Sequence, residues 1–299
     1  MREFSIGDAI TAGVRLVARE PLAFLAWALV YGLVGLTPQF VGMAMGFDAM
    51  STLRSGAAAD PEALTQAMAP MQALQPVSFV ASVVSGLLLY GAAYRAVLFP
   101  EDRRFLFLRL GGRELWMALT VVAVFLIAFA AILVVVLLIV GITAAGSAAA
   151  GASGALIAFP LILLLVGIMM WGASRLALAP PMAFAERNFR IPEAWRQTRG
   201  HAGRIFLVML GVFGLLLLAQ VLLFALGAGI FSLFMPLSEM GRLLMQNPAG
   251  LFAKIHPVGW ALAAVLWALF GTWSMAMFAA SLAEIYRGLR GPDHAEVFS

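Results

Sequence analysis

The sequence predicts an all-α polytopic membrane protein with six transmembrane helices. Hydrophobic residues make up 63% of the 299 residues and charged residues only 11%, which is outside the range of soluble globular domains. Six apolar segments are each long enough to cross a hydrocarbon core of about 30 Å as a helix. These segments are residues 21–41, 77–99, 115–140, 156–178, 205–231 and 258–282.

The distribution of basic residues predicts the orientation of these spans. If the N-terminus is cytoplasmic, the inner segments carry 14 of the 19 Lys and Arg residues, and the outer loops carry only Arg54, Arg242 and Lys254. Cytoplasmic loops of membrane proteins are enriched in Lys and Arg. We therefore expect both termini to be cytoplasmic.

We expect a single membrane domain over residues 1–299, composed of three pseudo-repeats at roughly 1–100, 101–180 and 181–299. The hairpins of the three repeats end alike, because Arg95, Arg175 and Arg287 each precede a proline by five residues. An arginine in the last helical turn can reach lipid phosphates and complement the helix dipole. The alternative is that any helix leaving the membrane towards the cytoplasm ends in this way.

Each repeat would begin with an amphipathic cytoplasmic segment, at 4–20, 105–115 and 189–204. In the first, an apolar stripe that includes Ile6, Ile10 and Val14 faces away from charged residues. A helix of this kind lies in the headgroup layer, so we expect interfacial helices on the cytoplasmic face.

The outer loops are expected to differ from one another. The uncharged, small-residue segment 141–155 predicts a tight turn between closely packed helices. Short surface helices are expected to begin at Pro61, which Asp60 and Glu62 flank, and at Ser238.

No pattern typical of catalysis or of a cofactor site is found in the sequence. There are no cysteines, and His201, His256 and His294 fall in three separate segments. The zinc-protease, serine-hydrolase, P-loop and dinucleotide-binding motifs are absent. We therefore predict no enzyme activity, no catalytic residue, no metal and no cofactor, and we attribute the basic pI to contact with anionic lipid rather than with nucleic acid.

The predicted membrane interior is nearly free of charge. Among its polar residues Gln220 is the most costly to bury, and we expect it to hydrogen-bond across a pair of helices. The alternative is that Gln220, Thr272 and Ser274 contact a ligand in a cavity.

Two segments carry a resemblance to a known family. One is the outer-loop sequence PEALTQAMAPMQAL; the other runs from Ala179–Pro180 to Glu193, Ala194, Trp195, Arg196, Thr198, Arg199 and Gly200. With six spans and an amphipathic N-terminus, the chain resembles the YciC-like group of bacterial inner-membrane proteins. That group is similar to the membrane domain of some glycerophosphodiester phosphodiesterases. The resemblance implies the bacterial inner (cytoplasmic) membrane and a lipid-related or envelope role, but no phosphodiesterase activity.

The leading hypothesis is a non-enzymatic protein that handles lipids or supports envelope homeostasis, with membrane lipids as partners. Arg95, Arg175, Arg196 and Arg199 are the predicted headgroup contacts. One alternative is a scaffold or accessory subunit that binds other membrane subunits. Another is a transporter of a small neutral or amphipathic solute, which would use Gln220, Thr272 and Ser274.

Overall fold

The computed structural model describes residues 4–54, 61–150, 154–233, 235–246, 254 and 256–290. Throughout these residues the regular structure is helical, without a strand. Six helical segments of this described part are long and apolar enough to cross a membrane, in agreement with the sequence prediction. They are Pro21–Gly46, Met68–Leu98, Arg104–Gly146, Ile162–Glu186, Ala202–Ser232 and Pro257–Arg290.

The helical elements are named by their bounds in the described residues. In chain order they are α1 (Ile6–Arg19), α2 (Pro21–Val30), the π-helix η1 (Tyr31–Leu36), α3 (Thr37–Arg54), α4 (Pro61–Leu98), the 3₁₀ turn η3 (Arg104–Phe107), α5 (Gly112–Ala150), α6 (Gly154–Leu176), α7 (Ala179–Glu186), α8 (Ile191–Gln197), α9 (Ala202–Ser232), α10 (Leu237–Gln246) and α12 (Pro257–Arg290).

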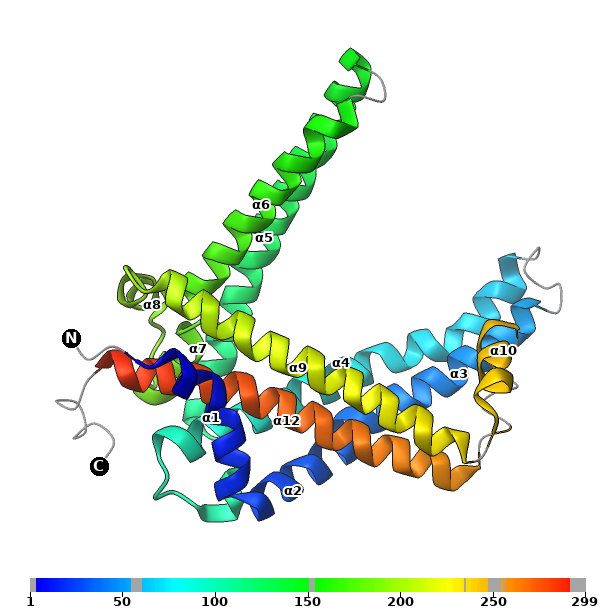
Figure 1. Cartoon of the computed structure of the whole chain (residues 1–299), viewed down its shortest axis with the longest axis horizontal. Coiled ribbons are helices and arrows are strands. Elements are labelled where there is room, and N and C mark those ends of the chain that lie inside the picture. Colours follow the sequence, from blue (N-terminus) through cyan, green and yellow to red (C-terminus); the bar gives the residue numbers. More distant parts are fainter. Residues whose placement is uncertain are drawn as a thin grey trace.

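The long helices form two arms that meet at one end. Figure 1 shows α5 and α6, in green, leaving this end as a hairpin that diverges from α3, α4, α9 and α12. We call it the Arg-rich end, because α4, α6 and α12 finish there with Arg95, Arg175 and Arg287 in their last turns. The sequence predicted this placement of the three arginines. Pro292, which would follow Arg287 in the repeat, lies outside the described residues.

Helix α1 packs against α12 and α9 at the Arg-rich end. Its buried face consists of small residues and one leucine, Ala9, Ala12, Gly13 and Leu16, whereas Val14 of the predicted apolar stripe is 43% exposed. The close approach depends on Gly13, because a Cβ there would lie 2.5 Å from the Cα of Met277. Helix α1 is therefore a packed part of the bundle.

The prediction of a tight turn at 141–155 was wrong; the predicted helix start at Pro61 is confirmed, but the helix there is not a short, separate one. Helix α5 runs to Ala150, so most of the expected tight turn at 141–155 is helical, and residues 151–153 lie outside the described part. Alanines favour helix and no proline interrupts the run. Helix α4 continues unbroken from Pro61 to Leu98 with Pro70 and Pro76 inside it, so no separate surface helix forms there. The predicted helix near Ser238 is present as α10.

Of the other two segments predicted to be amphipathic, one is helical only in part. Residues 105–115 form the end of η3, an extended stretch and the start of α5. In 189–204, Pro192 lies in the first turn of α8, as expected for proline. The helix is capped at Thr198, and Gly200, with a φ of +86°, lies two residues further on.

The contact between Gly13 and Met277 yields a stability prediction. Gly13→Ala should lower the melting temperature of the detergent-solubilised chain, because forcing a methyl into a closed contact costs about 1–3 kcal/mol. The matched control is Gly7→Ala on the same helix, where the nearest atom to a Cβ is Ser5 Oγ at 4.0 Å. Equal melting temperatures for the two variants would contradict the packing of α1 on α12.

Candidate functional site

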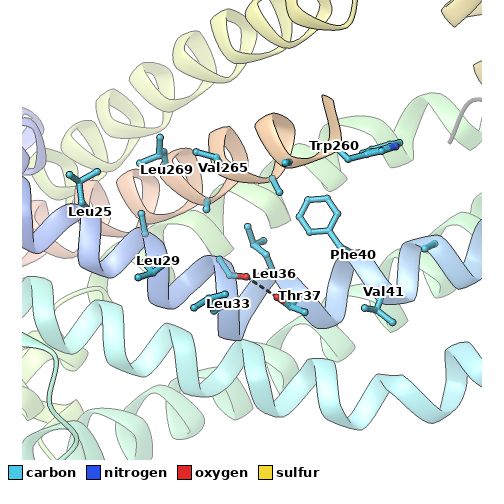
Figure 2. Close-up of a pocket in the computed structure, with 16 residues that line it drawn as sticks. Leu25, Leu29, Leu33, Leu36, Thr37, Phe40, Val41, Trp260, Val265 and Leu269 are labelled. Atoms are coloured by element: carbon cyan, nitrogen blue, oxygen red, sulfur yellow. Dashed lines mark hydrogen bonds between the residues drawn. The ribbon is translucent and has the colours of Figure 1, made fainter. Parts of the chain in front are cut away.

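A long apolar groove lies between the α2–η1–α3 segment and α12 (Figure 2). Its volume is about 800 Å³. One wall contributes Leu25, Ala28, Leu29, Gly32, Leu33, Leu36, Thr37, Phe40, Val41 and Ala44, and the other contributes Trp260, Ala261, Ala264, Val265, Ala268 and Leu269. Alanines on α12 face bulky residues on the opposite helix, which leaves space between the two backbones.

The π-helix η1 forms the middle of one groove wall. A π-turn widens the helix and withdraws a backbone carbonyl from its usual i+4 donor, and such turns are common at functional sites. Here the hydroxyl of Thr37 donates to the carbonyl of Gly32 at 3.2 Å, drawn as the dashed line in Figure 2. The Tyr31 ring packs against Gly271, where a Cβ would lie 2.4 Å from Cε1 of that ring. This contact holds the widened turn against α12.

The chemistry of the groove suits a hydrocarbon chain. Only Thr37 and Trp260 carry a polar group among the lining side chains, and the Thr37 hydroxyl is already bonded within the helix. The groove is open at its side, where Leu29 and Leu33 remain 63% and 65% exposed. The wall from Leu25 to Ala44 is about 28 Å long at 1.5 Å per residue, close to the thickness of a hydrocarbon core of about 30 Å.

A second, charged cavity of about 240 Å³ lies at the Arg-rich end. Its lining residues are Arg95, Asp102, Arg109, Gly111, Gly112, Arg113, Glu114 and Arg187. We call it the basic pocket, because four guanidinium groups face two carboxylates across it. It is formed where the end of α4, the start of α5 and the end of α7 meet.

Arg95 is the internal anchor of the basic pocket. Its side chain is 5% exposed and that of Glu114 is 2% exposed, and the two form an ion pair through Nη2 and Oε1. Arg95 Nη1 donates to the carbonyl of Phe107 at 2.7 Å, and Nε lies 3.7 Å from Asp102 Oδ2. The sequence prediction missed Glu114, although an acidic residue in a first helical turn is a recognisable capping signal.

The loop beside the basic pocket has an unusual backbone. Phe105, Leu106 and Phe107 have φ values of 52°, 55° and 68°, a left-handed region that is costly for residues other than glycine. Two side-chain donors hold it: Trp27 Nε1 bonds the carbonyl of Leu106 at 2.8 Å, and Arg95 bonds that of Phe107. As a result the Phe105 side chain points outward and is 81% exposed.

The four predicted headgroup arginines lie in different environments. Arg95 lines the basic pocket, whereas Arg175 is buried with its guanidinium 4.8 Å from the ring centre of Trp195 and 5.6 Å from that of Trp171. Arg196 is 73% exposed and pairs with Glu193 at 3.1 Å, and Arg199 is exposed just after α8. The last three belong to α6, to α8 and to the turn that follows α8, and none of them lines the basic pocket. Their contact with lipid stays a prediction.

The predicted cavity residues Gln220, Thr272 and Ser274 do not line the groove. Gln220 Nε2 and Thr272 Oγ1 are buried without a hydrogen-bond partner among the described residues, and Ser274 Oγ donates to the carbonyl of Phe270 on its own helix. Among the described residues, the amide nitrogen of Gln220 therefore does not make the hydrogen bond that was predicted across a helix pair.

Comparisons with protein-family models, with curated proteins and with solved structures found no match to this chain. The resemblance to the YciC-like group rests on the sequence motifs alone and stays a prediction. The function is therefore argued from the groove, the basic pocket and the distribution of charge.

The buried ion pair of the basic pocket predicts a large effect of removing one partner. Glu114→Ala should destabilise the chain by about 3–5 kcal/mol, because it leaves the Arg95 charge buried without a counter-ion. The measurement is thermal unfolding in detergent. The double variant Arg95→Met/Glu114→Leu should recover part of this loss, because it removes both charges.

The control is Glu284→Ala, which breaks an ion pair with Arg287, whose side chain is 57% exposed. This change should cost less than about 1 kcal/mol. If Glu114→Ala and Glu284→Ala had equal effects, the Arg95–Glu114 pair would not be the anchor described here.

Proposed function

We propose that this chain is a non-enzymatic protein of the bacterial inner membrane that binds lipid and holds an acyl chain in the groove between α2–η1–α3 and α12. The observation that carries the proposal is the nearly uniform apolar lining of a groove that is open at its side. A bilayer surrounds such an opening with hydrocarbon, so a lipid chain can enter without passing through water.

The shape of the groove supports an occupant with a long tail. The lining runs in a line along two helices, with Leu25 and Leu269 towards one end and Phe40 and Trp260 towards the other (Figure 2). The lining has no charged side chain, and its polar groups are only the Thr37 hydroxyl and the Trp260 indole, which are too few to bind an ion or a sugar specifically. The predicted solute contacts Gln220, Thr272 and Ser274 lie elsewhere, so no observation favours the transporter alternative.

We further propose that the Arg-rich end faces the cytoplasm. Arg196 and Arg199 are exposed there, and basic side chains near the surface of an anionic leaflet each contribute about 1 kcal/mol of attraction. In this orientation α1 and α8 lie at the level of the inner headgroups, and both termini are cytoplasmic.

A second candidate function is that of an accessory subunit of a larger membrane complex. The observation favouring it is the α5–α6 hairpin. The most apolar 18-residue stretch of α5 has a mean hydropathy of 3.5, and none of the residues in that stretch is buried. This arm diverges from the other helices (Figure 1), so partner helices could pack against both of its faces. A co-purifying subunit that is lost when the exposed faces of α5 are altered would support this candidate over a lipid-binding monomer.

Filling the groove should remove a bound lipid. In the variant Ala261→Phe/Ala264→Phe, two rings occupy the space beside α12, and native mass spectrometry should no longer show a retained lipid. The control Leu262→Phe lies on the same helix outside the groove lining and should retain the lipid.

A wild-type chain that carries no lipid would contradict the proposal, and so would a filled-groove variant that carries as much lipid as wild type. Because the double variant could lose its fold, a second measurement uses wild-type protein. A photoactivatable fatty acid, incorporated into membrane lipid, should cross-link to residues 25–44 or 260–269.

The orientation can be tested with single cysteines, because the chain contains none. In intact cells, a membrane-impermeant maleimide should label Ser238→Cys and leave Ser5→Cys unlabelled, since both positions are exposed but lie on opposite sides of the membrane. Permeabilised cells provide the control and should show labelling of both. Labelling of Ser5→Cys in intact cells would reverse the proposed orientation.

A further inference from the structure

We infer that the basic pocket at the Arg-rich end is a binding site for a phosphate ester, with the phosphate held by Arg109, Arg113 and Arg187. This goes beyond the acyl-chain groove, because it assigns a polar ligand to a different part of the molecule. The ligand is either a phospholipid headgroup at the membrane surface or a soluble organic phosphate, and both offer the same anionic group.

The first line of support is the charge balance. Asp102 and Glu114 are the only carboxylates that line the pocket, and four arginines line it with them. Glu114 is taken up by the ion pair with Arg95, and Asp102 lies 3.6 Å from Arg109 Nη1. An excess of positive charge therefore remains, and it stabilises a bound anion.

The second line of support is that two arginines have no carboxylate of their own. Across the described chain, neither Arg113 nor Arg187 forms an ion pair, and both line the pocket. The guanidinium of Arg113 lies 3.6 Å from the ring centre of Phe99, which orients it without neutralising it. Arginine presents a planar set of donors that binds phosphate with two parallel hydrogen bonds.

The third line of support is the backbone around the cavity. Gly111 and Gly112 line it at the start of α5, where the helix dipole and the first N–H groups favour an anion. Arg187 is held in a left-handed conformation with φ of 53° at the end of α7. Three separate elements thus direct donors to one cavity.

A carboxylate oxygen in the same pocket indicates that the ligand carries a hydrogen-bond donor in addition to its phosphate. Oε2 of Glu114 is buried and has no hydrogen-bond partner among the described residues. A buried acceptor without a donor is costly. A phosphate ester that also carries a hydroxyl or ammonium group, such as a glycerol or ethanolamine ester, would supply the donor.

The size and surroundings of the cavity limit the ligand further. A volume of about 240 Å³ lies below the range of about 300–1,000 Å³ typical of drug-sized ligands, so a headgroup or a small ester fits better than a nucleotide. The neighbouring loop exposes Phe105, Leu106 and Leu110 by 81%, 41% and 59%. These apolar side chains suit insertion at a membrane interface. They therefore favour a phospholipid headgroup over a soluble phosphate as the ligand.

The test is calorimetric titration of the full chain in detergent with three ligands: inorganic phosphate, glycerol 3-phosphate and a short-chain phosphatidylglycerol. Arg109→Gln/Arg187→Asn should weaken binding of each ligand that binds by at least about tenfold, because charge-assisted contacts are lost. Asparagine tolerates the left-handed backbone at position 187, so this variant should keep its fold and melting temperature. The control Arg19→Gln/Arg242→Gln removes the same charge outside the pocket lining and should bind as wild type does.

The outcomes distinguish a phospholipid headgroup from a soluble organic phosphate as the ligand, and they test the basic pocket separately from the acyl-chain groove. Binding of the lipid alone identifies a headgroup site, whereas binding of glycerol 3-phosphate identifies recognition of the ester itself. The groove variant Ala261→Phe/Ala264→Phe should keep phosphate-ester binding, so failure of the groove proposal leaves this result intact. Absence of saturable binding by all three ligands, or equal binding by wild type and Arg109→Gln/Arg187→Asn, would overturn the inference.

Discussion

The buried ion pair between Arg95 and Glu114 is the interaction on which the geometry of the Arg-rich end depends. It joins the last turn of α4 to the first turn of α5, and two charges at that depth are stable only together. Gly91 leaves room for this approach, because a Cβ there would lie 3.0 Å from Cγ of Glu114. The same arginine holds the left-handed loop through the carbonyl of Phe107. One pair thus sets both where the α5–α6 arm leaves the bundle and how the basic pocket is shaped.

The two candidate sites use opposite physical chemistry. The groove is apolar and open at its side, and small side chains on α12 face bulky ones on the α2–η1–α3 segment. The basic pocket combines an excess of guanidinium groups with a helix N-terminus. A lipid has both kinds of group, a hydrocarbon tail and a phosphate, but the groove and the pocket lie on different helices. Each site can therefore be disabled without altering the lining of the other.

Whether a feature was predictable depended largely on how far apart in the chain its interacting residues are. The six spans and the last-turn arginines depend on local composition, so both were predictable. The tight turn at 141–155 was wrong because helix propensity in an alanine-rich run outweighed the small-residue signal. The amide nitrogen of Gln220 has no partner among the described residues, and sequence alone could not show this, because such a contact depends on another helix. Glu114 was missed because its partner is 19 residues away, and no local pattern identifies such a pair.

The sequence by itself determined the class of protein, because hydropathy over about 20 residues suffices to define a helix that can cross a membrane. It also determined which end of the molecule is basic. Only the tertiary structure decided that α1 packs through Gly13 against Met277, that facing alanines and leucines leave a groove, and that Arg109, Arg113 and Arg187 share one cavity. The physical reason is that these features depend on distances between segments far apart in the chain, which helix packing sets and local periodicity does not.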